Sequence, residues 1–307
     1  MKILSVCGKI AMCLFSLCFL GVIGAHGQTN KDYYEQFLKE FQQKDTSAVS
    51  NTISKWETAF PESAELVIAR ANVFLSKSAQ EVIRTTVEPP KFDDGRCLVL
   101  KDSLGNVSGY MYSEFVFNED YFQKWVTTLQ DGIKKYPERI DLRSGLVYSY
   151  FQNSRFEQAC AELLSLVHHS KEIDNKWYGL FDEPYDKATL YDCLQDYFTY
   201  FIDGRSDISY VKKYVDAVLE VFKDNPVFYS DRAYVYLMEG DFDSAIKEYE
   251  LAYTLDPSDM LIVTNLGYLY EQKGDKKKAI EYYKKVIDSP AEQYLKDMAQ
   301  EGLNALK

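Results

Sequence analysis

The chain has 307 residues, 47 acidic and 35 basic side chains, and a formal net charge of −12. An acidic surface repels phosphate backbones, and no run of basic residues offsets that repulsion, so nucleic acid is not expected as a partner. Glycine and proline are scarce, at 15 and 8 residues, whereas tyrosine and phenylalanine reach 25 and 18. This composition argues against a β-sandwich or a propeller, and the length predicts two domains or a stacked repeat.

Residues 1–27 predict a secretory signal peptide. Two lysines precede an apolar block at 10–23, and the block ends in Ala25 and Gly27 with one residue between them. Cleavage would make Gln28 the N-terminal residue of the mature protein. It removes two positive and no negative charges, so the net charge changes from −12 to −14. We expect an exported bacterial protein, periplasmic or secreted, with no stable transmembrane span after cleavage. An uncleaved membrane anchor is the alternative.

Three cysteines remain after the signal peptide: Cys97, Cys160 and Cys193. Three thiols can form at most one disulfide, and a chain of this length does not need a disulfide framework to fold. We predict that Cys160 and Cys193 are small core residues on helices.

The first segments after the signal peptide predict a pair of helices. Val49, Ile53 and Trp56 recur at helical spacing. Pro61 ends this helix, because the residue before a proline is pushed out of the helical conformation. The small and apolar residues of 64–78 predict the helix that follows.

Residues 88–117 interrupt the helical pattern. Segments 97–100 and 109–112 are rich in strand-forming residues, and 103–106 is a turn sequence between them. We therefore predict that 97–112 form a two-stranded antiparallel hairpin that projects from the helices. Because a lone hairpin is marginally stable in water, it should pack on neighbouring helices or be mobile.

Helical patterns resume near residue 119 and continue from Ile140 into a polar, aromatic stretch at 170–187. That stretch predicts a structured loop holding three aromatic residues and two acids: Trp177, Tyr178, Phe181, Asp182 and Glu183. This set fits a glycan or small-molecule site. The alternative is that its aromatic residues fasten the loop to the helices beneath it.

The most regular pattern lies at 226–290 and occurs twice. Ala245 and Ala279 stand 34 residues apart, as do Gly240 and Gly274. The two copies read Tyr229-x-x-Arg232-Ala233-x-x-Tyr236, Gly240-Asp241, Ala245-x-x-x-Tyr249 and Val263-x-x-Leu266-Gly267-x-x-Tyr270, Gly274-Asp275, Ala279-x-x-x-Tyr283. The small residues allow two antiparallel helices to approach closely, with Ala233 against Ala245 and Gly267 against Ala279, while tyrosines fill the space beside them.

This pattern resembles the tetratricopeptide repeat (TPR), which has the same period and the same small and aromatic positions. The resemblance implies a right-handed superhelix of helix pairs whose first helices line a concave groove. In this family the groove commonly holds an extended peptide or a helix of a partner.

Counting back by the same period predicts unit starts at 192, 140, 64 and 30 besides 226 and 260, with the hairpin and the loop as insertions. We predict an all-α solenoid of about six TPR helix pairs. Its parts are N-terminal units at 28–139 with the β-hairpin insertion at about 88–117, a unit with the loop insertion at 140–191, three consecutive units at 192–293, and a capping helix at 294–307.

The resemblance also implies which side chains face the groove. The eighth residue after each unit start gives Leu38, Asn72, Tyr148, Tyr200, Tyr234 and Tyr268. The candidate partner-binding residues are Tyr148, Tyr200, Tyr234, Tyr268, Asn265, Met238 and Gln272. Alternatively, some of these tyrosines pack on a neighbouring helix. Of the residues with which some family members clamp a C-terminal carboxylate, only Asn265 is present, so no such clamp is expected.

The sequence contains no recognisable catalytic motif. His168 and His169 are adjacent and point in different directions, so they predict a solvated pair rather than a metal site. We therefore expect no enzyme activity, no cofactor and no metal. The favoured function is a protein–protein interaction scaffold in the cell envelope that binds a partner segment in the concave groove. The alternative is an accessory substrate- or glycan-binding protein, or an enzyme, that uses the hairpin insertion and the 170–187 loop.

Overall fold

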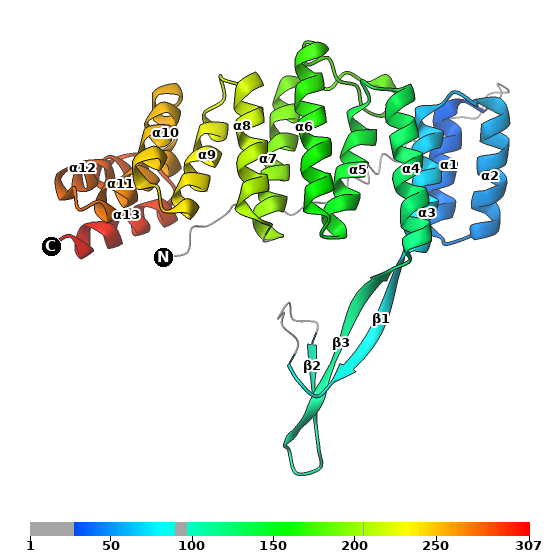
Figure 1. Cartoon of the computed structure of the whole chain (residues 1–307), viewed down its shortest axis with the longest axis horizontal. Coiled ribbons are helices and arrows are strands. Elements are labelled where there is room, and N and C mark those ends of the chain that lie inside the picture. Colours follow the sequence, from blue (N-terminus) through cyan, green and yellow to red (C-terminus); the bar gives the residue numbers. More distant parts are fainter. Residues whose placement is uncertain (1–27, 90–96, 205) are drawn as a thin grey trace. The chain divides into compact units, whose positions relative to one another are not determined.

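The computed structural model describes residues 28–89, 97–204 and 206–307, so the predicted signal peptide lies outside it. The described residues form thirteen α-helices and three β-strands (Figure 1). They divide into two compact units. The N-terminal unit comprises the described residues up to Ser149 together with Tyr178–Glu183, and the C-terminal unit comprises Tyr150–Trp177 and Pro184–Lys307.

The N-terminal unit is built from α1 (Asn30–Gln42), α2 (Thr46–Ala59), α3 (Ala64–Ser78), α4 (Glu119–Lys135) and most of α5 (Ile140–Gln152). Its first helices pack around Trp56 and Phe37, which are both completely buried. The sequence sets the helix starts: the Thr29 hydroxyl accepts from the backbone nitrogen of Asp32, and the Asp32 carboxylate accepts in return from Thr29. This capping box satisfies backbone donors that a helix start leaves unpaired.

An antiparallel sheet is inserted between α3 and α4 (Figure 1). It consists of β1 (Ala79–Thr86), β2 (Cys97–Lys101) and β3 (Val107–Phe117), in the order β1-β3-β2. Strands β2 and β3 confirm the predicted hairpin. Strand β1 was not predicted, because its Ala-Gln-Glu start continues the helical composition of α3.

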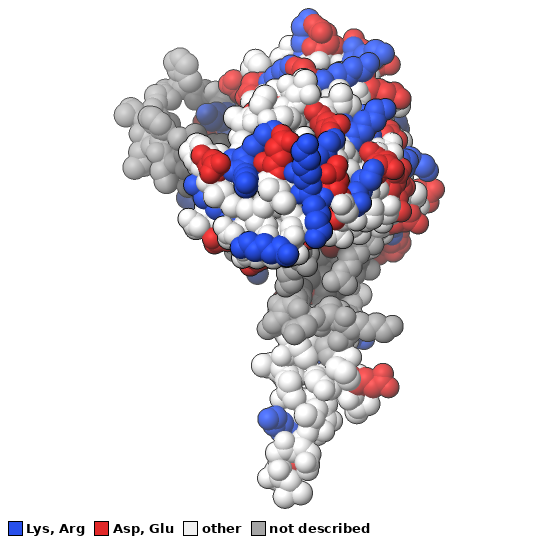
Figure 2. Space-filling model, turned by 90° about the vertical axis from the view of Figure 1, so that its left-hand side faces the viewer, with Lys and Arg blue, Asp and Glu red and all other residues white. Residues whose placement is uncertain are grey.

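The sheet leaves the helices and returns to them at one place. Ala79 pairs with Phe117 at its base, and the backbone nitrogen of Asn118 donates to the Ser78 carbonyl at 2.7 Å. Apolar side chains of the sheet are exposed, with Ile83 at 74%, Leu98 at 60% and Leu104 at 84%. Figure 2 shows few charges on the visible tip of the sheet, whereas the helices facing the viewer carry many charges of both signs.

The C-terminal unit is a succession of helix pairs. Its helices after α5 are α6 (Phe156–Glu172), α7 (Lys187–Asp203), α8 (Ile208–Val221), α9 (Pro226–Glu239), α10 (Phe242–Leu255), α11 (Met260–Gln272), α12 (Lys276–Asp288) and α13 (Gln293–Ala305). Gly240 and Gly274 adopt the left-handed conformation, with φ of 78° and 79°, and the aspartate after each one caps the next helix. The Gly-Asp pairs therefore turn the chain between paired helices, as their chemistry predicts.

Small residues bring the paired helices together: Ala233, Ala245 and Ala279 are completely buried. The contact of Gly267 differs from the prediction. The nearest atoms to a Cβ built on Gly267 belong to the ring of Tyr283, at 2.7 Å, so this ring rather than Ala279 occupies the space that the glycine leaves. The same ring lies against Gly302 of α13, which explains how the last helix covers the final pair.

The predicted solenoid of helix pairs, with a β insertion and a terminal capping helix, is confirmed. Helices α1, α3, α5, α9 and α11 begin where the period places unit starts, while α7 begins at Lys187, five residues before the predicted 192. The grouping of the units into larger blocks stays a prediction. Within the described ranges, no helix combines the length and the apolar character needed to cross a bilayer.

Candidate partner-binding groove

Three of the predicted groove tyrosines lie on the first helices of the C-terminal unit: Tyr200 on α7, Tyr234 on α9 and Tyr268 on α11. Each is half-buried. Tyr200 stacks on Phe151 with ring centroids 5.3 Å apart, and Tyr234 meets Phe198 edge-on at 5.9 Å. Tyr268 packs beside the core of the last pairs. Each ring is therefore held by the protein on one side and partly open on the other.

The other predicted groove residues differ in their exposure to solvent and in whether they form hydrogen bonds within the protein. Met238 is 59% exposed, and Gln272 is also exposed. Asn265 is half-buried, and its amide nitrogen donates to the Tyr249 hydroxyl at 3.2 Å, so part of its hydrogen-bonding capacity is used internally. Tyr148 is 38% exposed and lies on the part of α5 that belongs to the N-terminal unit.

A row of acids on α7 escaped the sequence analysis. Asp192, Asp196 and Asp203 are all exposed. Their spacings of four and seven residues place them on one face of the helix, opposite the buried Leu194 and Phe201. We call these three residues the acidic row. The family offset pointed only to Tyr200 on this helix, whereas the helical spacing of the aspartates would have revealed the row.

The acidic row lies close to the tyrosines. Asp196 and Asp203 stand four residues before and three residues after Tyr200 on α7, so both are neighbours of that ring on the helix surface. Burial, and next the negative charge of Asp203, raise the pKa of the Tyr234 hydroxyl. Burial and the neighbouring Asp192 raise the pKa of Asp196. Like charges four residues apart on a helix repel each other, so the row costs the folded protein stability.

Helices α7, α9 and α11 carry two basic residues among those described, Lys187 and Arg232. Both form ion pairs with residues of other segments. Lys187 pairs with Asp224 after α8. Arg232 pairs with Glu248 of α10 at 2.8 Å and lies 3.8 Å from Asp216 of α8. These cations therefore face the second helices of the pairs, and the face that carries the tyrosines is acidic and aromatic.

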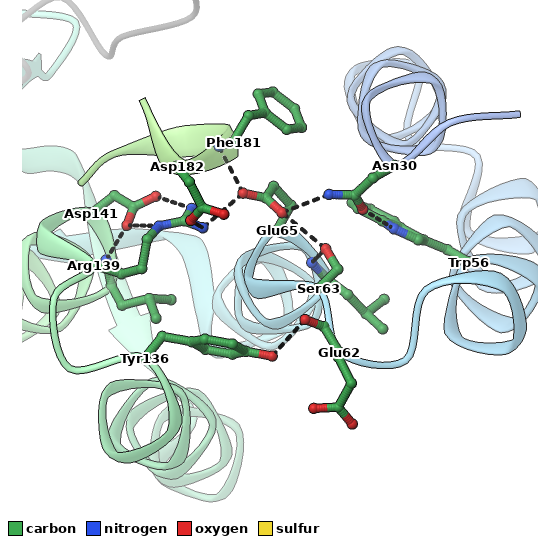
Figure 3. Close-up of polar contacts among 12 residues, drawn as sticks. Asn30, Trp56, Glu62, Ser63, Glu65, Tyr136, Arg139, Asp141, Phe181 and Asp182 are labelled. Carbon is green, nitrogen blue, oxygen red and sulfur yellow. Dashed lines mark hydrogen bonds and ion pairs between the residues drawn. The ribbon is translucent and has the colours of Figure 1, made fainter. Parts of the chain in front are cut away.

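A buried polar network organises the N-terminal unit (Figure 3). Arg139 and Glu65 are 4% and 3% exposed, and the guanidinium lies 2.9 Å from the Glu65 carboxylate and 2.7 Å from Asp141. Burial opposes ionisation of Glu65, but hydrogen bonds from Phe181 and Asn30 and the charge of Arg139 outweigh it and lower its pKa. The pair is thus ionised and well satisfied.

The network joins segments that are distant in the sequence. Asn30 of α1 donates to Glu65 at 2.8 Å and accepts from the Trp56 indole of α2 at 2.7 Å. The backbone nitrogen of Phe181 also donates to Glu65, at 2.8 Å. Phe181 and Asp182 both have positive φ, of 57° and 56°, so the network holds a turn in a conformation that most residues avoid.

The aromatic residues of the 170–187 loop are occupied by packing. Trp177 is 1% exposed, and its indole nitrogen donates to the Ser170 hydroxyl at 2.9 Å. Phe181 is half-buried and meets Tyr34 edge-on at 5.5 Å. The interpretation that these residues fasten the loop is confirmed for Trp177, which leaves the glycan-site alternative without its largest ring.

The prediction of a solvated histidine pair holds for His168, which is exposed, but is wrong for His169, which is half-buried. His169 lies 2.8 Å from Glu172 and edge-on to Trp177. Cys160 is buried, Cys97 and Cys193 are half-buried, and all three are free thiols. In the parts of the chain that the structure describes, no three His, Cys, Asp or Glu side chains are grouped so as to hold a metal ion.

Comparison with known proteins agrees with this architecture. The tetratricopeptide-repeat family model matches residues 228–259 and 262–293, the last two helix pairs. The chain therefore contains tetratricopeptide repeats in its last two helix pairs.

Its curated relatives match it over part of its length. The chain is 30% identical over 97 residues to the small glutamine-rich tetratricopeptide repeat-containing protein 2 of Saccharomyces cerevisiae, which covers 32% of this chain and 28% of the relative. It is 28% identical over 120 residues to a TPR repeat-containing protein of Methanocaldococcus jannaschii, with 34% and 20% covered. The match thus spans less than a third of either relative.

Among solved structures, YrrB, described as a TPR protein with an unusual peptide-binding site, matches 81% of this chain and 97% of its own length. The TM-score is 0.43 and the sequence identity 13%. At these values the likeness supports no conclusion about function.

Proposed function

We propose that the protein is a non-catalytic scaffold that binds a segment of a partner protein along the exposed face of α7, α9 and α11. The observation that carries the proposal is the arrangement of Tyr200, Tyr234 and Tyr268, which stand 34 residues apart, each anchored internally and each partly exposed. Stacked repeats place equivalent positions side by side. Rigid aromatic side chains with a polar tip supply much of the energy of protein interfaces.

We further propose that this scaffold acts outside the cytoplasm, in the periplasm or after secretion. The support is the order of charged, apolar and small residues in 1–27. N-terminal sequencing of the protein isolated from its own cells should begin at Gln28. A sequence that begins at Met1 would overturn the export proposal and leave the binding proposal intact.

The binding proposal is tested by separating binding from stability. The double variant Tyr234→Ala/Tyr268→Ala is compared with Tyr253→Ala, which removes a half-buried tyrosine of α10 that packs on Tyr282. Cross-linking in the native envelope, followed by purification and mass spectrometry, identifies partners captured by the wild type. Loss of one aromatic anchor typically costs about 2 kcal/mol of binding, so capture by the double variant should fall at least about 30-fold.

The control variant should capture partners as the wild type does, and the melting temperature of the double variant should stay within a few degrees. A large loss of stability, with unchanged capture per folded molecule, would show that the two tyrosines belong to the core and that the binding surface lies elsewhere.

A further inference from the structure

We infer that the segment bound on this face is cationic: a stretch of another protein in which arginine or lysine alternates with apolar residues. This inference rests on the proposed function and adds the chemistry of the partner. The surface that recognises it combines the acidic row, Asp192, Asp196 and Asp203 on α7, with Tyr234 on α9 and Tyr268 on α11.

The negative charge of the acidic row is not balanced by a described basic residue of the protein. None of the three carboxylates of the acidic row forms an ion pair with a described residue, and the basic residues of the same helices face the other way, toward Asp224, Asp216 and Glu248. Over eleven residues the row extends about 16 Å along α7, a length that an extended segment of about five residues spans. A cationic segment would supply the positive charge that the acidic row lacks within the protein.

The tyrosine rings of the proposed face differ from others in this unit, because no described cation lies over Tyr234 or Tyr268. Elsewhere in this unit lysines sit over tyrosine rings, with Lys212 4.2 Å from the centre of Tyr236 and Lys278 4.4 Å from that of Tyr270. A guanidinium can lie on a tyrosine face and form hydrogen bonds to a carboxylate with its edge, so a face on which Asp196 and Asp203 flank Tyr200 suits arginine in particular.

The acidic row lowers the stability of the free protein. Asp192 and Asp196 repel each other, and no internal cation relieves them. A local violation of this kind, without internal compensation, is typical of functional surfaces. Neutralising the row should therefore stabilise the free protein while it weakens binding, a combination that a purely structural role of these residues does not produce.

The test uses the mature chain and three fluorescent synthetic peptides of 12 residues that share leucine and tyrosine at the same positions. The remaining positions are arginine, glutamine or glutamate. Fluorescence anisotropy at about 50 mM salt should show binding of the arginine peptide, much weaker binding of the glutamine peptide and none of the glutamate peptide. Raising the salt to about 500 mM should weaken the arginine complex, because the exposed charges become screened.

A matched pair of variants locates the site. The triple variant Asp192→Asn/Asp196→Asn/Asp203→Asn should lose at least about tenfold in affinity for the arginine peptide and melt at a higher temperature than the wild type. The control Glu157→Gln/Glu220→Gln/Asp288→Asn removes the same charge from exposed positions of α6, α8 and α12, and it should bind as the wild type does. Equal losses in both variants would mean unspecific attraction to an acidic protein and would overturn the inference.

The two proposals fail separately. If the native partner is captured through Tyr234 and Tyr268, but the arginine peptide binds no better than the glutamate peptide, the groove binds protein and the cationic inference is wrong. If the arginine peptide binds through the acidic row while Tyr234→Ala/Tyr268→Ala leaves capture of the native partner unchanged, the row is a cation-binding surface and the proposed scaffold face is wrong.

Discussion

In the C-terminal unit the same few contacts hold each pair of helices, whereas the N-terminal unit is organised by a network that occurs once. Ala233, Ala245 and Ala279 are buried at equivalent crossings, and Gly240 and Gly274 make equivalent turns. Among the described residues of the other unit, the nearest counterpart of Arg139 and Glu65 is Arg232 with Glu248, where the arginine side chain is less deeply buried. Packing that repeats leaves a period in the sequence, while a single polar network leaves no pattern there.

The units also differ in how they bury an acid. Glu65 has a cation and several donors, and its pKa is lowered. Asp231 of α9 is 6% exposed and accepts one hydrogen bond, from Gln195 at 3.1 Å. Burial therefore raises its pKa well above 3.8. The comparison shows that compensation by neighbours, rather than depth, decides whether a buried carboxyl stays charged.

Removing the cation of the N-terminal network should have the largest effect. Arg139→Met keeps most of the side-chain volume and leaves Glu65 buried without its partner. Breaking a buried pair in this way costs about 3–5 kcal/mol, which urea unfolding followed by tryptophan fluorescence will measure. The control Lys134→Met breaks an exposed pair with Asp131 in the same unit and should cost less than about 1 kcal/mol. Equal losses would mean that the network contributes no more than a surface contact.

The repeated packing is tested at a crossing of the C-terminal unit. Gly267→Leu forces a side chain into the space held by the Tyr283 ring, where even a Cβ would lie 2.7 Å from it. Overpacking of this kind costs about 1–3 kcal/mol, visible as a lower melting temperature. Ala161→Leu introduces the same side chain at an exposed position of α6 and should change little. An unchanged melting temperature for Gly267→Leu would contradict the close contact.

The sequence determined the repeats better than the contacts within them. The period placed the starts of α9 and α11, because small residues and glycine turns must recur wherever helices cross closely. It did not distinguish Ala279 from Tyr283 as the neighbour of Gly267, since both lie on the face of α12 that is turned inward. The helical spacing of the aspartates would have revealed the acidic row, but not its role: that depends on which cations are engaged elsewhere, and tertiary structure decides it.

A smaller effect is expected from the buried carboxyl of α9. Because the folded protein holds the Asp231 proton more tightly than the unfolded chain does, its contribution to stability is complete below about pH 3.8 and declines as the pH rises through the raised pKa. Asp231→Asn removes this decline. Its amide can also donate to the Gln195 side-chain oxygen, which is buried without a partner.

Thermal melts between pH 4 and pH 9 measure this effect. The variant should match the wild type at the acid end and melt several degrees higher at the alkaline end, since about 1 kcal/mol corresponds to 2–4 °C in a domain of this size. A constant difference at all pH values would show that Asp231 is ionised throughout.

The smallest effect on the helices should come from removing the sheet. Asn118 and Ser78 are joined by a backbone hydrogen bond of 2.7 Å at the base of the insertion, so a short Gly-Ser turn can replace 79–117 without moving α3 or α4. Deleting only 88–117, the insertion expected from the sequence, removes β2 and β3 and leaves β1 without its partner. We expect circular dichroism of the 79–117 variant to retain the helical signal, and the 88–117 variant to aggregate more readily, because an unpaired strand recruits other chains. Loss of helix content in the first variant would show instead that the sheet stabilises the N-terminal unit.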